Sequence, residues 1–166
     1  MTAVTAKRTT GAESQDSVPV FSSITPRRVV LDTNVLVSLY VFTDSRFALL
    51  RAKVESGEWL AITNDACFDE FRRVLGYPLF ALAEEHQQTA LEAYSASVMR
   101  NVESRQASAL LPRCTDRDDQ KFLELARDSA ADWLVTADKA LLRLARRDRL
   151  RGLFRILTPE MALTEA

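Results

Sequence analysis

Short apolar runs alternate with longer amphipathic stretches along this chain from about residue 27 onward. Four apolar runs predict strands that are buried on both faces, as in a parallel sheet covered on both sides. These strands span 27–33, 59–63, 133–136 and 154–157. Apolar residues three or four positions apart predict helices at 34–40, 45–55, 65–75, 81–105, 115–130, 139–149 and, as a short final helix, from 158. Strands that alternate with helices predict an α/β fold with a mostly parallel sheet.

Composition fits one folded domain preceded by a tail. Residues 1–26 are rich in Thr, Ser and Ala and lack an apolar period, so we expect them to be a disordered tail before a domain at 27–163. The 166 residues are 47% apolar and 27% charged, which is ordinary for a globular protein that can bury a core.

The location expected from the sequence is the cytoplasm. No apolar run approaches the roughly 20 residues of a membrane span, and the start of the chain lacks the apolar segment of a secretory signal. Cys67 and Cys114 form neither a CxxC pair nor a metal-ligand spacing. Two buried free thiols in a reducing compartment are therefore favoured over a disulfide.

Two predicted helices carry an acid on the face where apolar residues belong. Residues step by about 100° around a helix, so Glu70 shares a face with Cys67, Phe71 and Val74, while Asp69 points away. An inward carboxylate needs a cation or a proton.

In the next such helix, Asp119 lies on the face of Phe122, Leu123 and Ala126, with Lys121 on the other side. Capping of the helix start is an equal alternative for Asp119. It is the favoured interpretation for Asp116 and Asp118.

Two further acids follow predicted strands. Asp32 ends the first strand and Asp138 follows the third, at the edge where open α/β sheets bind ligands. For either residue alone, capping of the next helix is the commoner explanation. Four acids in one geometry favour hard divalent cations, Mg²⁺ or Mn²⁺, two of which can drive phosphodiester hydrolysis. The single histidine, His86, has no evident Ser or Cys partner and is expected on a helix surface.

The distribution of charge bears on nucleic-acid binding more than its sum. The net charge is −1, which by itself argues against a nucleic-acid binder. Seven cations nevertheless accumulate near the end of the chain, against one acid. They are Lys139, Arg143, Arg146, Arg147, Arg149, Arg151 and Arg155. Such a stretch could hold a phosphate backbone, although a solvated helix face is the commoner meaning of a charge run.

Five segments together resemble the PIN-domain family of nucleases, and closest the bacterial subgroup described as toxin components of toxin–antitoxin pairs. They are VLDTNVL at 30–36, DEFRRVL at 69–75, DRDDQKFLELA at 116–126, ADWLVTADK at 131–139 and ILTPEMA at 156–162. Each motif alone is weak, but their order and spacing are specific, and the similarity covers roughly 27–163.

The resemblance implies a three-layer α/β/α fold with a sheet of four or five strands, and RNA cleavage with Mg²⁺ or Mn²⁺, two ions being expected. It implies RNA as substrate, and a cognate antitoxin and a homodimer as partners. It carries over Asp32, Glu70, Asp119 and Asp138 as metal-binding catalytic residues. It also carries over Thr33, Asn34 and Thr136 as groups that orient them. Arg143, Arg146 and Arg147 are the candidates to hold RNA.

The sequence departs from this subgroup at two positions. Ala137 stands where Gly is common, and Ala140 where a further Asp is frequent. Both departures bear on the strength of a second metal site.

Two other functions compete with the nuclease hypothesis. One is a PIN-like scaffold that binds RNA or a protein without cutting. The other is a Mg²⁺-dependent phosphatase of a different α/β fold. Such phosphatases commonly need a second Asp two residues after the nucleophile, where this chain has Asn34.

Overall fold

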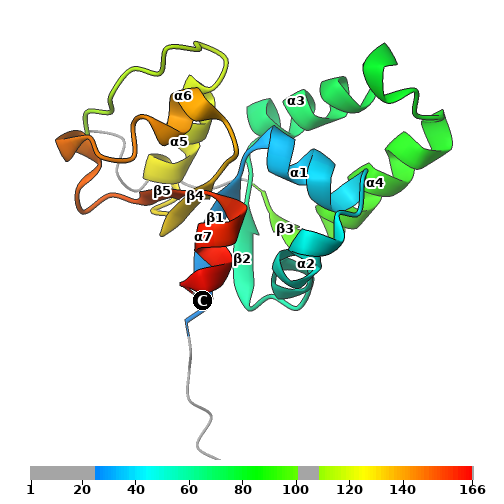
Figure 1. Cartoon of the computed structure of the whole chain (residues 1–166), viewed down its shortest axis with the longest axis horizontal. Coiled ribbons are helices and arrows are strands. Elements are labelled where there is room, and N and C mark those ends of the chain that lie inside the picture. The colour runs from blue at the N-terminus through cyan, green and yellow to red at the C-terminus, as the bar shows by residue number, and fades with distance from the viewer. Residues whose placement is uncertain (1–24, 101–108, 166) are drawn as a thin grey trace, which may run out of the picture.

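A computed structural model of the chain describes residues 25–100 and 109–165 (Figure 1). The predicted tail therefore lies almost wholly outside the described residues, as does the end of the helix predicted at 81–105. Within the described ranges, no helix is long and apolar enough to cross a membrane.

A sheet of five parallel strands forms the centre of the fold. Its order is β3-β2-β1-β4-β5, with β1 (Arg27–Leu31) in the middle. The other strands are β2 (Trp59–Ile62), β3 (Val98–Met99), β4 (Trp133–Val135) and β5 (Arg155–Leu157). In the register, Val30 lies opposite Ile62 of β2 and Leu134 of β4. The predicted α/β class with a mostly parallel sheet is confirmed.

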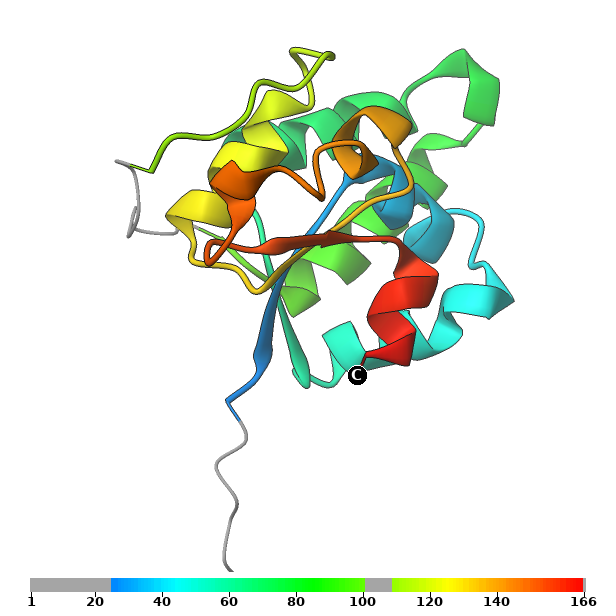
Figure 2. The same cartoon turned by 60° about the vertical axis from the view of Figure 1, so that its left-hand side comes forward.

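Helices cover both faces of this sheet because its side chains alternate between two apolar clusters (Figure 1). Val29 and Leu31 belong to the cluster formed with helices on one face, whereas Val30 belongs to the cluster on the other. The first face carries α1 (Thr33–Tyr40), α2 (Ala48–Glu55), α3 (Asp65–Leu75), α4 (Glu84–Ser97) and α7 (Pro159–Thr164). The second carries α5 (Gln120–Asp128) and α6 (Lys139–Leu142). Figure 2 shows β5 leading into α7, which returns beside α2.

The helix predicted at 81–105 is wrong in extent. A 3₁₀ turn, Pro78–Phe80, ends at Ala81 in a left-handed conformation, and α4 begins only at Glu84. After Ser97 the chain extends, so that Val98 and Met99 pair with Ala61 and Ile62 of β2. A two-residue strand has too few positions to show a period of two, and periodicity alone does not separate it from the end of a helix.

The helices predicted at 115–130 and 139–149 are shorter than expected. Asp116 bonds the backbone N–H of Asp118 in a turn, and α5 starts at Gln120. Beyond α6, tight turns follow instead of a helix, and a 3₁₀ segment spans Asp148–Leu150. Like charges three or four residues apart, as at Arg143, Arg146 and Arg147, disfavour a continuous helix.

Candidate functional site

The strand order reverses between β1 and β4, which is where open α/β sheets form a ligand-binding crevice at the carboxyl ends of their strands. β2 and β3 lie on one side of β1, and β4 and β5 lie on the other. Asp32 directly follows β1, and Asp138 comes shortly after β4. Glu70 lies on α3 and Asp119 directly precedes α5. These four residues are called the acidic cluster below.

Asp32 is held in place by one side chain from α1 and one from the residue that follows β4. It is 3% exposed, and its Oδ2 accepts hydrogen bonds from Thr136 Oγ1 at 2.6 Å and Asn34 Nδ2 at 2.8 Å. Its side chain does not cap α1. The capping alternative is therefore wrong for Asp32, and its carboxylate is fixed by donors at the sheet edge.

The same two donors set the turn that leads to Asp138. Thr136 Oγ1 accepts from the backbone N–H of Asp138 at 2.9 Å, and Asn34 Oδ1 accepts from that of Ala137 at 3.2 Å. Ala137 does not have a positive φ, so this turn does not require glycine. The departure from the family pattern at residue 137 therefore leaves the turn unstrained.

Glu70 faces inward, as its helical position predicts. Asn64 begins α3 by accepting a hydrogen bond from the backbone N–H of Cys67 at 2.9 Å. The side chain of Glu70 is 13% exposed against 63% for Asp69. Thr33 Oγ1 donates to Glu70 Oε1 at 2.8 Å and so orients the carboxylate.

Glu70 Oε2 is buried and accepts no hydrogen bond, and its neighbours are cations. Lys121 of α5 forms an ion pair with it, and Arg73 lies 4.0 Å away. The sequence pattern places Lys121 on the outer side of its helix, and that expectation is wrong. The long lysine stem lets the ammonium reach across from α5 to α3. The sequence signal that could have indicated this ion pair is that Lys121 comes only two residues after the inward acid Asp119.

Asp119 occupies the residue before α5, but its side chain makes no capping hydrogen bond. It is half-buried, whereas Asp116 and Asp118 are exposed. Burial is the largest cause that raises the pKa of Asp119 to about 7. Four acidic neighbours raise it further, namely Asp32, Asp138, Asp116 and Glu70. Partial burial and the absence of a capping hydrogen bond favour the inward interpretation of Asp119 over the capping alternative.

Burial also raises the pKa of Asp32 to about 6, and the Thr136 hydrogen bond opposes this rise. The charges of Glu70 and Asp138 add to it. The fold therefore brings all four predicted acids close enough to repel one another, and this repulsion is relieved by a proton or a cation.

Asp138 caps a helix as well as facing the acidic cluster. Its Oδ1 accepts from the backbone N–H groups of Ala140 at 2.6 Å and Leu141 at 3.1 Å, at the start of α6. The capping alternative is right for this oxygen. The cap also fixes the position of the carboxylate relative to the carboxyl end of β4.

The acidic cluster fits a divalent cation in charge and donor type. Carboxylate oxygens suit Mg²⁺ and Mn²⁺, and the buried Asp32 and half-buried Asp119 form no ion pair within the residues that the structure describes. In the part of the chain that the structure describes, however, no three Asp, Glu, His or Cys side chains converge as a finished ligand set. Glu70 is directed to Thr33 and Lys121, and Asp138 to α6. Ligation of a shared ion therefore requires a rotation of at least one of these side chains.

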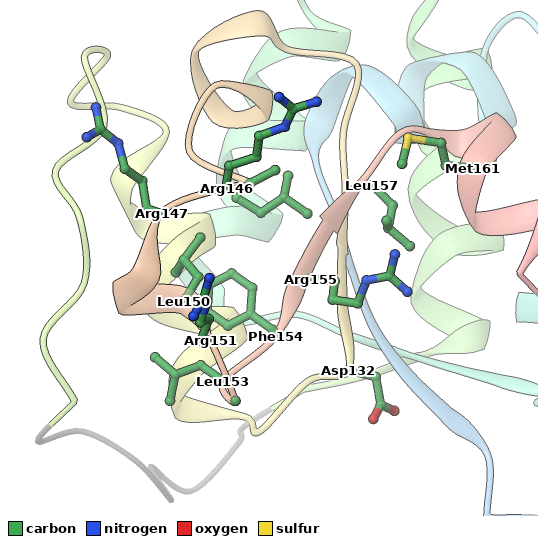
Figure 3. Close-up of a pocket in the computed structure, with 13 residues that line it drawn as sticks. Asp132, Arg146, Arg147, Leu150, Arg151, Leu153, Phe154, Arg155, Leu157 and Met161 are labelled. Atoms are coloured by element: carbon green, nitrogen blue, oxygen red, sulfur yellow. The ribbon is translucent and has the colours of Figure 1, made fainter.

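The candidate RNA-binding arginines are exposed and lie at or just beyond the end of α6. Arg146 and Arg147 line a hollow of about 630 Å³ along β5, shown in Figure 3. Arg143 and Lys139 line a neighbouring hollow. None of the four acids lines either hollow, so the structure does not bring these cations into the acidic cluster.

The remaining candidates lie where the sequence predicts. Cys67 and Cys114 are buried free thiols, and burial raises the pKa of Cys67 to about 12, which keeps that thiol protonated at neutral pH. His86 is exposed on α4.

The raised pKa of Asp119 predicts that Asp119→Asn stabilises the metal-free protein at pH 8. An unfolded Asp titrates near about 3.9, so between about 4 and 7 the folded protein keeps a proton that the unfolded chain has lost, and stability falls as pH rises. Thermal unfolding in EDTA should give a higher Tm for Asp119→Asn than for wild type at pH 8 and nearly equal values at pH 4. Exposed Asp118→Asn is the control. An unchanged or lower Tm at pH 8 would contradict this explanation.

Comparison with known proteins agrees with this geometry. The family model of the PIN domain matches residues 28–140, a range that includes the whole acidic cluster. No curated protein matches the chain. Five parallel strands with helices on both faces are consistent with the three-layer PIN fold. The chain therefore belongs to the PIN domain family, whose members are generally nucleases that act on RNA with divalent metal ions.

Proposed function

We propose that this protein is an endoribonuclease that hydrolyses RNA phosphodiester bonds with Mg²⁺ or Mn²⁺. The observation that carries the proposal is the acidic cluster at the switch point of the sheet, where burial and mutual repulsion raise the pKa of Asp32 and Asp119. Structural ion pairs usually neutralise buried acids, whereas here three of the four acids lack a cationic side chain among the ion pairs of the described residues. Perturbed acids gathered at a ligand-binding edge are typical of catalytic sites.

Asp32, Asp119 and Asp138 would hold the cation, with Glu70 beside them. A divalent cation supplies Lewis-acid polarisation of a phosphoryl oxygen and lowers the pKa of a water molecule. Thr136 and Asn34 keep Asp32 in one rotamer through their hydrogen bonds, and Thr33 does the same for Glu70. Such outer contacts fix the direction of ligand oxygens before substrate binds.

The nuclease proposal is tested with a circular single-stranded RNA, which an exonuclease does not cut. We expect the purified chain to linearise it with Mn²⁺ or Mg²⁺ and to be inactive in EDTA. Asp119→Asn removes a candidate ligand and should lower the cleavage rate by about a hundredfold or more, the usual range for a lost catalytic group. Asp118→Asn, its exposed neighbour, should retain activity.

The alternative is a PIN scaffold that binds RNA or a protein without cutting. Intact RNA after incubation with Mn²⁺, together with equal RNA affinity in wild type and Asp119→Asn, would favour that alternative and overturn the nuclease proposal.

We infer that Arg143, Arg146 and Arg147 hold the RNA backbone. This inference is supported by the exposure of the three arginines at or just beyond the end of α6, the helix that Asp138 caps. Phosphate contacts release counterions, so each arginine that binds a single strand adds about 0.7 to the salt slope of affinity.

Each Arg→Ala substitution at 143, 146 or 147 should therefore weaken RNA binding and lower this slope by about 0.7. The measurement is fluorescence anisotropy across a salt series, in the non-cleaving Asp119→Asn background. Arg72→Ala, an exposed arginine paired with Asp69 on α3, is the matched control. Equal salt slopes of RNA affinity in all four variants would show that the RNA does not bind at these three arginines.

The biological role we propose is the toxin of a type II toxin–antitoxin pair in the cytoplasm, inhibited by a cognate antitoxin that covers the acidic cluster. Support for this role is the resemblance of segments 30–36, 69–75 and 131–139 to that subgroup. Growth arrest on expression, relieved by co-expression of a small neighbouring gene whose product co-purifies, would be the expected behaviour. We also propose that the protein forms a homodimer, which analytical sedimentation of the purified chain would detect.

A further inference from the structure

We propose that the Lys121 ammonium takes the place of a second divalent ion in the acidic cluster. The site then binds one divalent ion. This inference rests on the proposed function, because it concerns the metal that the nuclease would use. The four acids alone suggest two ions. The contacts of Lys121 change that expectation.

Lys121 lies inside the site even though its helical position points outward. Its side chain is 22% exposed, and its ammonium forms an ion pair with Glu70 Oε2. The ammonium also lies 5.4 Å from the centroid of the Phe122 ring, and its charge reaches Cys67 on α3. Lys121 therefore bridges α5, which Asp119 directly precedes, and α3, which carries Glu70.

Both oxygens of Glu70 are occupied in this arrangement. Oε1 accepts from Thr33, and Oε2 faces the Lys121 ammonium. A divalent ion placed at Oε2 would lie beside that ammonium and be repelled by it. Arg73, at 4.0 Å from the same oxygen, adds to this repulsion.

The three other acids have no such cation. Asp32 directly follows β1, Asp119 directly precedes α5, and Asp138 follows β4 and caps α6, so all three lie at the switch point of the sheet. No ion pair within residues 25–100 and 109–165 involves any of the three. The single ion is therefore assigned to Asp32, Asp119 and Asp138. Lys121 is a positioning residue whose ion pair holds Glu70 in the orientation that accepts the hydrogen bond from Thr33.

The test counts Mn²⁺ per chain by isothermal titration calorimetry and by electron paramagnetic resonance of the unbound ion. Wild type should bind one Mn²⁺. Lys121→Met keeps the stem length and removes the charge, and should bind two. Lys121→Arg keeps the charge and should bind one. Lys53→Met removes an ion-paired lysine at Glu58, far from the site, and should also bind one.

Each outcome decides the inference. Two ions in wild type, or one ion of unchanged affinity in Lys121→Met, would overturn the role of Lys121 while leaving metal-dependent cleavage intact. No Mn²⁺ bound by wild type would overturn the proposed metal dependence and, with it, this inference.

A second readout needs no metal. In EDTA, Lys121→Met leaves Glu70 buried with only the exposed Arg73, 4.0 Å away, as a cationic neighbour, and should lower the Tm. Adding Glu70→Gln to Lys121→Met should restore most of that loss, because the unpaired charge is gone. Equal Tm losses in the single and double variants would show that Lys121 does not act through Glu70, and would overturn the inference.

Discussion

The hydrogen bond from Thr136 to Asp32 joins the two central strands at the point where the sheet order reverses, and the remaining site depends on it. It fixes a carboxylate that is 3% exposed, and the same hydroxyl accepts from the backbone of Asp138. Asn34 repeats this double role through its amide. One small polar network therefore sets the direction of Asp32 and the path of the turn that presents Asp138.

Burial and crowding of the acids work against the stability of the metal-free fold, although the hydrogen bond from Thr136 opposes this effect at Asp32. Burial and mutual repulsion raise the pKa of Asp32 to about 6 and of Asp119 to about 7, so both acids are held where their charged forms are disfavoured. Glu70 differs from these two acids because it forms an ion pair with Lys121, which lies on the helix layer of the opposite sheet face. Only one of the four acids forms an ion pair among the described residues, so the other charges destabilise the fold. Their presence is better explained by a role in ligand binding than by a role in folding.

The sequence predicted Glu70 and Asp119 well because helical periodicity assigns a face to every residue, and an acid on an apolar face stands out. Asp138 was ambiguous, and the structure shows it capping α6 while its charge acts on the cluster. Lys121 was misplaced because periodicity locates a Cα but not the end of a flexible side chain. The strand at Val98–Met99 was missed because two residues are too few to show the alternation that marks a strand.

The most direct measurement is a crystal structure of the chain grown with Mn²⁺, with anomalous scattering used to locate the ion. We expect an anomalous peak within ligand distance of the carboxylates of Asp32, Asp119 and Asp138. A crystal with Mn²⁺ bound elsewhere, or with these carboxylates turned away from any ion at saturating Mn²⁺, would contradict the claim that they form the metal site of a nuclease.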